Sequence, residues 1–196
     1  SLNNLKNLCG GEGGLFVTDS DDVLRKGELV RCFGDECDEV TLRRKYNASI
    51  LGYMYRNQEL PAALARGQLK HLDELNAIRI RNSEYLNRHL GEIPGVIPPS
   101  CPADCKHVYW FYALRFDPQA AGIDAEPRRF RVAVEKALSK EGVLVGQWQT
   151  MPVLAQDIFQ SMIGYGKRYP WAINEAKGIT YKYDPNDFPV AQMLCE

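Results

Sequence analysis

Lys6 is the residue near the start of the chain whose type and neighbours could support chemistry. It precedes the segment Gly10-Gly11-Glu12-Gly13-Gly14, which indicates a tight turn ahead of a short apolar run. The spacing is not that of a Walker loop, since no Gly-Lys-Ser/Thr follows, nor of a dinucleotide-binding fingerprint, since its third glycine position fails. An ordinary lysine has a pKa near 10.4 and is neutral in only about one in 10³ molecules at pH 7. On these grounds alone Lys6 is compatible with a surface lysine, because a nucleophilic lysine must be desolvated or have a shifted pKa.

Cysteine and histidine are the other residue types that could carry a site. The six cysteines are Cys9, Cys32, Cys37, Cys101, Cys105 and Cys195. The pairs Cys32/Cys37 and Cys101/Cys105 enclose four and three residues, which is only loosely compatible with zinc ligands. The three histidines fall in different predicted elements. We therefore expect scattered thiols in a reduced cytosolic protein and no metal, with a zinc module on the cysteine pairs as the alternative.

The composition excludes several classes of protein. The chain has 196 residues and a mass of 22.2 kDa, with 45% apolar and 25% charged residues, as in ordinary globular proteins. No apolar run approaches the ~20 residues that span a bilayer. With 24 basic and 25 acidic residues the net charge is −1, which argues against a non-specific nucleic-acid binder. Because the chain begins at Ser1 without Met or a leader-like segment, we expect a processed start or a piece of a longer protein.

The elements that must position these residues are predicted from periodicity and capping signals. Strands are expected at the apolar segments 15–18, 108–116 and 143–145. Helices are expected from the acidic cluster at 19–22 to about Gly34, over about 30 residues ending at Leu90, and over 127–140 with Gly142 as the stop signal. Segment 35–50 is expected to be a loop and 94–105 a linker.

This order of elements indicates an α/β protein with two parts. Residues 1–57 are predicted to be the C-terminal portion of an α/β domain. Residues 58–196 are predicted to be a long helix that leads into a small α+β domain. One strand in the first part is too few for a sheet, so its partner strands are expected to come from sequence elsewhere.

Several segments together resemble the DegT/StrS-type sugar aminotransferases, which are fold-type I pyridoxal-phosphate (PLP) enzymes. The first is the run from Ser1 to Lys6 that leads into Gly11-Glu12-Gly13-Gly14. The second, Gly52-Tyr53-Met54-Tyr55-Arg56, is similar to the family's Gly-Tyr-Asn-Tyr-Arg loop. Others are similar to the start of its interdomain helix, at 59–73, and to its C-terminal domain, at 107–109 and 142–152. The resemblance covers nearly the whole chain in the family's order.

The resemblance implies a fold and an activity. The fold would be the end of the PLP-binding large domain, a long interdomain helix and an incomplete small α+β domain, so the chain would be about half of the expected length. Lys6 would hold PLP as a Schiff base, and the Ser1 hydroxyl would contact the phosphate. An amino group would move from Glu or Gln to a keto-sugar nucleotide or a related cyclitol, in antibiotic or polysaccharide biosynthesis. Lysine at position 6, where some relatives carry histidine and dehydrate, favours amino transfer.

The resemblance also implies a cytoplasmic homodimer, in which the loop with Tyr53 and Arg56 faces the partner's site. Met54 departs from the family's asparagine, and a thioether cannot donate a hydrogen bond. Trp148 and Gln149, in a segment that differs from the commoner family pattern, are candidates for substrate contact, with plain packing of Trp148 as the alternative. An ion pair with Glu59 is the alternative for Arg56. The alternative function is a non-catalytic member that acts in assembly or regulation.

Overall fold

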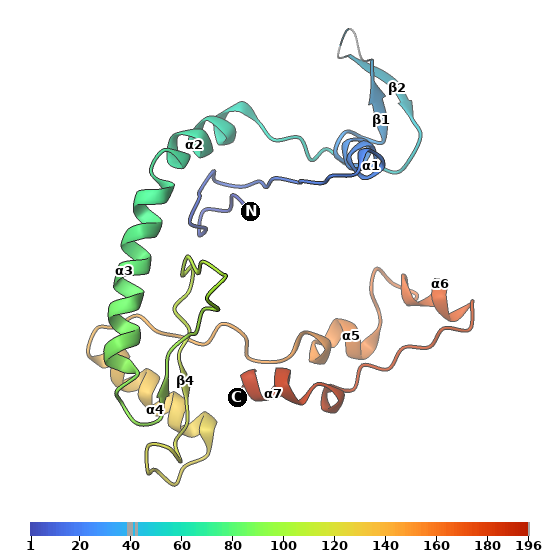
Figure 1. The fold of residues 1–196 in the computed structure, drawn as a ribbon. Coiled ribbons are helices and arrows are strands. Elements are labelled where there is room, and N and C mark those ends of the chain that lie inside the picture. The colour runs from blue at the N-terminus through green and yellow to red at the C-terminus, as the bar shows by residue number, and fades with distance from the viewer. Residues whose placement is uncertain (39–40, 42, 196) are drawn as a thin grey trace. The chain divides into compact units, whose positions relative to one another are not determined.

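The computed structural model describes residues 1–38, 41 and 43–195, and these form two compact units (Figure 1). The first unit comprises Ser1–Gly91 and Pro98–Leu114, and the second comprises Glu92–Ile97 and Arg115–Glu196. The helices and strands of the first unit are α1 (Asp21–Arg31), β1 (Asp35–Cys37), β2 (Arg44–Ala48), α2 (Glu59–Leu69) and α3 (Leu72–Leu90). Those of the second are β3 (Val96–Ile97), β4 (Arg115–Phe116), α4 (Pro127–Lys140), α5 (Asp157–Ser161), α6 (Trp171–Glu175) and α7 (Pro189–Cys195), with 3₁₀ turns at Val153–Ala155 and Pro185–Asp187.

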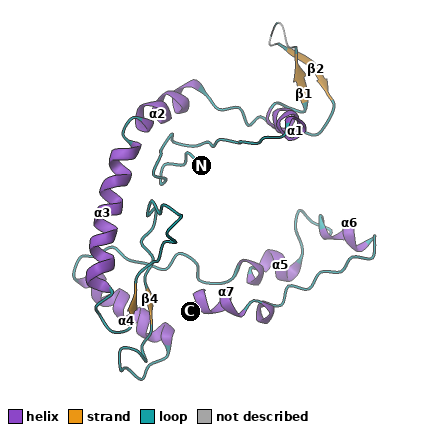
Figure 2. Ribbon diagram, viewed as in Figure 1, coloured by secondary structure: helices purple, strands orange, loops and turns teal. Residues whose placement is uncertain are grey.

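The predicted first helix is confirmed as α1, and its start follows from capping. The Ser20 hydroxyl accepts a hydrogen bond from the Val23 N–H at 3.4 Å, and Asp21 and Asp22 stand in the first turn. The loop predicted for 35–50 is wrong, because β1 and β2 form an antiparallel hairpin beside α1 (Figure 2). Polar side chains on these strands give no alternating apolar signal, so the sequence pattern does not reveal them.

The single helix of about 30 residues is also corrected, because it is two helices. α2 ends at Leu69 and α3 begins at Leu72, so Lys70 and His71 form a turn between them (Figure 1). Their N–H groups bond to the carbonyls of Gly67 and Gln68, three residues back, which tightens and closes the last turn of α2. The side chains that α3 buries are the polar Asn76 and Ser83, although the sequence predicts an apolar stripe. None of the helices in the described ranges has both the length and the apolar character needed to cross a bilayer.

The strand predicted at 15–18 is wrong within the described part of the chain. Leu15, Phe16 and Val17 are exposed at 79%, 65% and 85%, and the segment joins no β-ladder there. Its apolar residues are of the types favoured in strands, but the described residues supply no neighbouring strand with backbone partners for them. The buried apolar side chains of the described residues are Leu2, Leu29, Cys32, Ala65 and Trp171.

The second unit begins with a two-stranded antiparallel pair, β3 with β4. The predicted strand 108–116 therefore shortens to its last two residues, and the expected linker contains β3. The predicted helix 127–140 is confirmed as α4, which Glu126 caps through hydrogen bonds from the Arg128 and Arg129 N–H groups. The predicted strand 143–145 is absent from the described structure, and Leu144 there is fully exposed.

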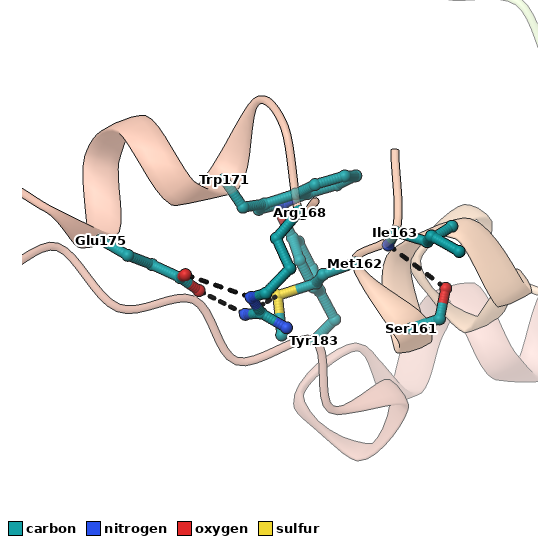
Figure 3. A network of polar contacts seen from close by, with 7 residues as sticks. All are labelled: Ser161, Met162, Ile163, Arg168, Trp171, Glu175 and Tyr183. Carbon is teal, nitrogen blue, oxygen red and sulfur yellow. Dashed lines mark hydrogen bonds and ion pairs between the residues drawn. The ribbon is translucent and has the colours of Figure 1, made fainter. Parts of the chain in front are cut away.

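A polar and aromatic network holds the later part of the second unit together (Figure 3). Arg168 makes two hydrogen bonds with the carboxylate of Glu175, and these lower the pKa of Glu175 below its ordinary value. The Trp171 indole N–H donates to the Tyr183 hydroxyl at 2.7 Å, and the Phe159 ring meets both rings edge-on. These contacts join α5 and α6 to the extended segment that contains Tyr183.

Candidate active site

The segment that carries Lys6 is a loop closed by its own backbone. The Leu2 N–H donates to the Gly13 carbonyl at 2.8 Å, and the Gly10 N–H donates to the Leu2 carbonyl at 2.8 Å. Gly13 has a φ of +133°, which disfavours other residue types. A Cβ at Gly10 would lie only 3.1 Å from the Cβ of Ala65, so the glycine lets the loop pack closely against α2. The tight turn predicted from the glycines is therefore confirmed, and Gly10 adds a close approach to α2.

Ser1 and Lys6 lie on this loop. The exposed Ser1 hydroxyl accepts a hydrogen bond from the Asn3 N–H at 3.3 Å, and the Asn3 side chain donates to Glu12 at 2.7 Å. The Lys6 N–H donates to the Asn3 carbonyl at 2.9 Å. The Lys6 side chain is half-buried, and no carboxylate of the described residues forms an ion pair with it.

An aromatic segment, 107–112, packs against the lysine loop. The Trp110 indole N–H donates to the Leu5 carbonyl at 2.6 Å, and the Lys6 ammonium nitrogen lies 2.8 Å from the centroid of the Trp110 ring. On the other side of Lys6, the side-chain amide of Asn7 donates to the Val108 backbone carbonyl at 3.0 Å. Sequence reasoning did not predict that Trp110 touches Lys6. The signal in the sequence is the density of aromatic residues in the segment, and that density predicts a strand and no contact with Lys6.

One face of α3 completes the environment of the lysine loop. The side-chain amide of Asn7 also donates to the Asn76 side-chain oxygen at 3.0 Å, while the side-chain oxygen of Asn7, Oδ1, is buried without a hydrogen-bond partner among the described residues. About three turns further along the helix, the side-chain amide of Asn87 donates to the Tyr109 hydroxyl at 3.3 Å, and its oxygen accepts from the Tyr112 hydroxyl at 2.8 Å. Burial, and secondarily Tyr109, raises the pKa of Tyr112 above its ordinary value of 10.0. The face of α3 toward the site is therefore polar.

The loop with Tyr53 and Arg56 is attached to the end of α1. The Tyr53 carbonyl accepts from the Phe33 N–H at 2.8 Å, and the Tyr53 N–H donates to the Val30 carbonyl at 2.7 Å. A Cβ on Gly52 would lie 2.0 Å from the Gly34 nitrogen, so this attachment requires a residue without a side chain. The Tyr53 ring stacks on the Tyr55 ring at a centroid distance of 5.0 Å, and both are exposed.

Arg56 has an aromatic neighbour. Its guanidinium carbon lies 5.4 Å from the centroid of the Phe33 ring. The ion pair with Glu59 that the sequence allowed is absent from the ion pairs of the described residues. Met54 forms an isolated antiparallel bridge with Cys32, and the residue is exposed at 54%.

Comparison with known proteins identifies the family of the chain. The profile of the DegT/DnrJ/EryC1/StrS aminotransferase family matches residues 1–179. The chain belongs to this family. The resemblance drawn from the motifs is thereby confirmed.

Solved structures show the same fold. The chain is similar to DesV from S. venezuelae (TM-score 0.64, 22% identity), over 82% of this chain and 38% of that one. It is similar to the sugar aminotransferase CalS13 from Micromonospora echinospora (0.64, 24%), over 79% and 38%, and to 3-amino-5-hydroxybenzoic acid synthase (0.58, 26%), over 71% and 34%. The mixed helix and strand fold is confirmed, and the chain spans less than two fifths of the length of each of these structures.

PLP is the cofactor associated with this aminotransferase family, and the residues of the lysine loop fit it. Lys6 presents a primary amine, without a carboxylate partner among the described residues, on a loop whose backbone is fixed at both ends. A primary amine is the group that PLP requires for covalent attachment. The Ser1 hydroxyl is exposed and has a hydrogen to donate to a phosphate oxygen.

Two further residues are predicted for the aminotransferase site, Trp148 and Gln149. Trp148 and Gln149 belong to the second unit and are exposed, so their contact with a substrate stays a prediction.

Cys101 and Cys105 are free and exposed, and the described residues contain no group of three or more metal-ligating side chains. The side chain of Cys37 lies outside the described part of the structure. The division into domains at 57 and 58 also stays a prediction.

Proposed function

We propose that the protein is a PLP-dependent aminotransferase that moves an amino group from Glu or Gln to a keto-sugar nucleotide or a related cyclitol. The observation that carries the proposal is Lys6 on its closed, glycine-bounded loop, within a chain of the aminotransferase family. The sugar aminotransferase name of CalS13 supports the class of substrate. Antibiotic or polysaccharide biosynthesis in the cytoplasm is the setting that this substrate class favours.

In this proposal the residues of the chain have separate tasks. Lys6 attaches the cofactor, and its amine, once freed, accepts and returns the proton at the α-carbon of the amino donor. Ser1 donates a hydrogen bond to the cofactor phosphate. When bound, PLP supplies an electron sink for the carbon that carries the amino group. Tyr53 and Arg56 contribute to the site of the partner subunit in a homodimer, and Trp148 and Gln149 contact the amino donor or the sugar.

Reductive trapping tests the assignment of Lys6. The full-length protein, as its gene encodes it, is mixed with PLP and treated with borohydride, and its peptides are identified by mass spectrometry. We expect the added pyridoxyl mass on Lys6, and its loss in Lys6→Ala. Lys26→Ala is the matched control, because Lys26 is an exposed lysine of α1, and it retains the label on Lys6. A label that stays at another lysine in place of Lys6 contradicts the proposal.

A kinetic measurement tests the reaction class. We expect Lys6→Ala to lower the rate of 2-oxoglutarate formation from Glu and a keto-sugar nucleotide by at least about a hundredfold, the scale of a lost proton-transfer group. Lys26→Ala is expected to leave this rate unchanged. Unchanged turnover in Lys6→Ala overturns the proposed role.

A further inference from the structure

The segment from Val108 to Trp110 contacts the residues on both sides of Lys6. Trp110 donates from its indole N–H to the carbonyl of Leu5, the residue before Lys6, at 2.6 Å. Val108 accepts at its carbonyl from the side chain of Asn7, the residue after Lys6, at 3.0 Å. Because the Asn7 side chain donates to Asn76 as well, these contacts also connect the lysine loop to α3. The two ends of the lysine's peptide segment therefore have fixed positions relative to the indole.

The Lys6 amine itself lies on the face of that indole, 2.8 Å from the ring centroid. An ammonium over the face of tryptophan is attracted to the negative potential of the ring, and tryptophan is the strongest of the aromatic side chains in this respect. The hydrogen bond to Leu5 fixes the orientation in which the ring presents its face. The Phe111 ring, 4.1 Å away between centroids, packs against the Trp110 ring.

We propose that Trp110 is a positioning residue for Lys6: in the cofactor-free protein it holds the lysine amine on its indole face, and cofactor attachment requires the amine to leave that face. The proposal rests on the proposed role of Lys6. It assigns Trp110 no contact with the reacting atoms of the substrate. The indole face fixes where the Lys6 amine lies before PLP binds. The hydrogen bonds at Leu5 and Asn7 keep the lysine segment in place.

Lysine reactivity in the absence of PLP tests the proposal without any need for activity. The cofactor-free full-length protein is treated with limiting formaldehyde and cyanoborohydride, and methylation of each lysine is followed by mass spectrometry. Loss of the indole face in Trp110→Ala is expected to raise the methylation rate of Lys6 by about two- to fivefold, the scale of a partly exposed cation–π contact. The exposed Lys26 and Lys136 serve as internal references and keep their rates.

Two further variants separate positioning from a loss of structure. Trp110→Phe keeps a ring face but cannot donate to Leu5, so we expect a smaller rise in Lys6 methylation than in Trp110→Ala. If Trp110→Ala fails to fold, Trp110→Phe decides the question. Tyr85→Ala removes an exposed ring from α3 that contacts His89, and it is expected to leave Lys6 methylation unchanged.

The outcomes distinguish this proposal from the proposed function. Lys6 rates equal to those of the unmodified sequence, in folded variants at position 110, overturn the role of Trp110 even where PLP attaches to Lys6. A rise confined to Lys6 supports the holding contact. Failure of borohydride to trap PLP on Lys6 overturns the proposed function, and with it the link from this contact to cofactor attachment, while the methylation rates still decide whether Trp110 holds the amine.

Discussion

Asp35 is the charged side chain on which the hairpin beside the Tyr53 loop depends. Its side chain is fully buried, and it accepts hydrogen bonds from the Tyr46 and Asn47 N–H groups and from the Arg44 guanidinium, at 2.9, 3.1 and 3.0 Å. Burial by itself raises the pKa of Asp35, but the hydrogen bonds from Asn47, Tyr46 and Arg44 together outweigh it. The pKa of Asp35 therefore lies below its ordinary value of 3.8.

This shift predicts an acid-dependent stability. Because the pKa of Asp35 is lower in the folded than in the unfolded chain, its contribution is complete above the unfolded value and is lost as the pH falls through the folded value. We expect Asp35→Asn to lower the thermal unfolding midpoint at about pH 5 to 6, where the native carboxylate is charged, and to lower it less at about pH 3. Circular dichroism at both pH values measures the two midpoints.

The matched control is Asp19→Asn, at an exposed acid ahead of α1. Its effect on the unfolding midpoint is expected to be small at both pH values. If the unfolding midpoints of the native protein and Asp35→Asn differ by the same amount at about pH 6 and at about pH 3, the Asp35 charge does not stabilise the hairpin.

At the scale of elements, the end of α4 shows how a glycine places the segment that follows. The Gly142 N–H donates to the Ser139 carbonyl at 3.1 Å, and the Val143 N–H donates to the Leu138 carbonyl at 2.9 Å. These two bonds form a Schellman motif, which requires the left-handed backbone that Gly142 adopts, with a φ of +85°. The predicted stop signal at Gly142 is confirmed, and it turns the chain toward the segment with Trp148.

Gly142→Ala is therefore expected to destabilise the second unit by about 1 to 2 kcal/mol, the cost of a left-handed conformation for a residue with a Cβ. Chemical denaturation followed by circular dichroism measures the change. The control is Gly146→Ala, because an added Cβ there has open space and the backbone is not left-handed. Equal stability of the two variants would contradict this account of the helix end.

Elements with strong local signals could be predicted from the sequence, and elements that depend on distant partners could not. Ser20 and Gly142 mark the ends of α1 and α4 through bonds within a few residues. The segment with Leu15 and Phe16 has the composition of a strand, but a strand also needs a neighbour. The hairpin is formed around the buried charge of Asp35, which an apolar pattern does not reveal.

The same distinction applies to the candidate site. Lys6 and its glycine turn could be found because the motif is continuous in the sequence. Trp110 is 104 positions away from Lys6, and its approach depends on hydrogen bonds to Leu5 and through Asn7 to α3. No local pattern encodes that contact.

At the scale of the whole molecule, the proposed homodimer places Lys6 and Arg56 in one site from two subunits. The loop with Arg56 is held at the end of α1 through Tyr53, and its exposed rings and guanidinium are free of an ion pair to Glu59 within the described structure. If the loop serves the partner's site, the two residues of one subunit belong to different sites. Defects at Lys6 and at Arg56 should then complement each other.

Mixed dimers test this arrangement. Lys6→Ala and Arg56→Ala proteins are each expected to be inactive or strongly impaired in amino transfer. When the two are unfolded and refolded together, half of the dimers are mixed, and each mixed dimer has one site with both native residues. We expect activity near about a quarter of the native value, from the symmetry of a two-fold dimer. If the loop instead serves its own subunit, each site of a mixed dimer lacks one residue, and refolding together restores no activity.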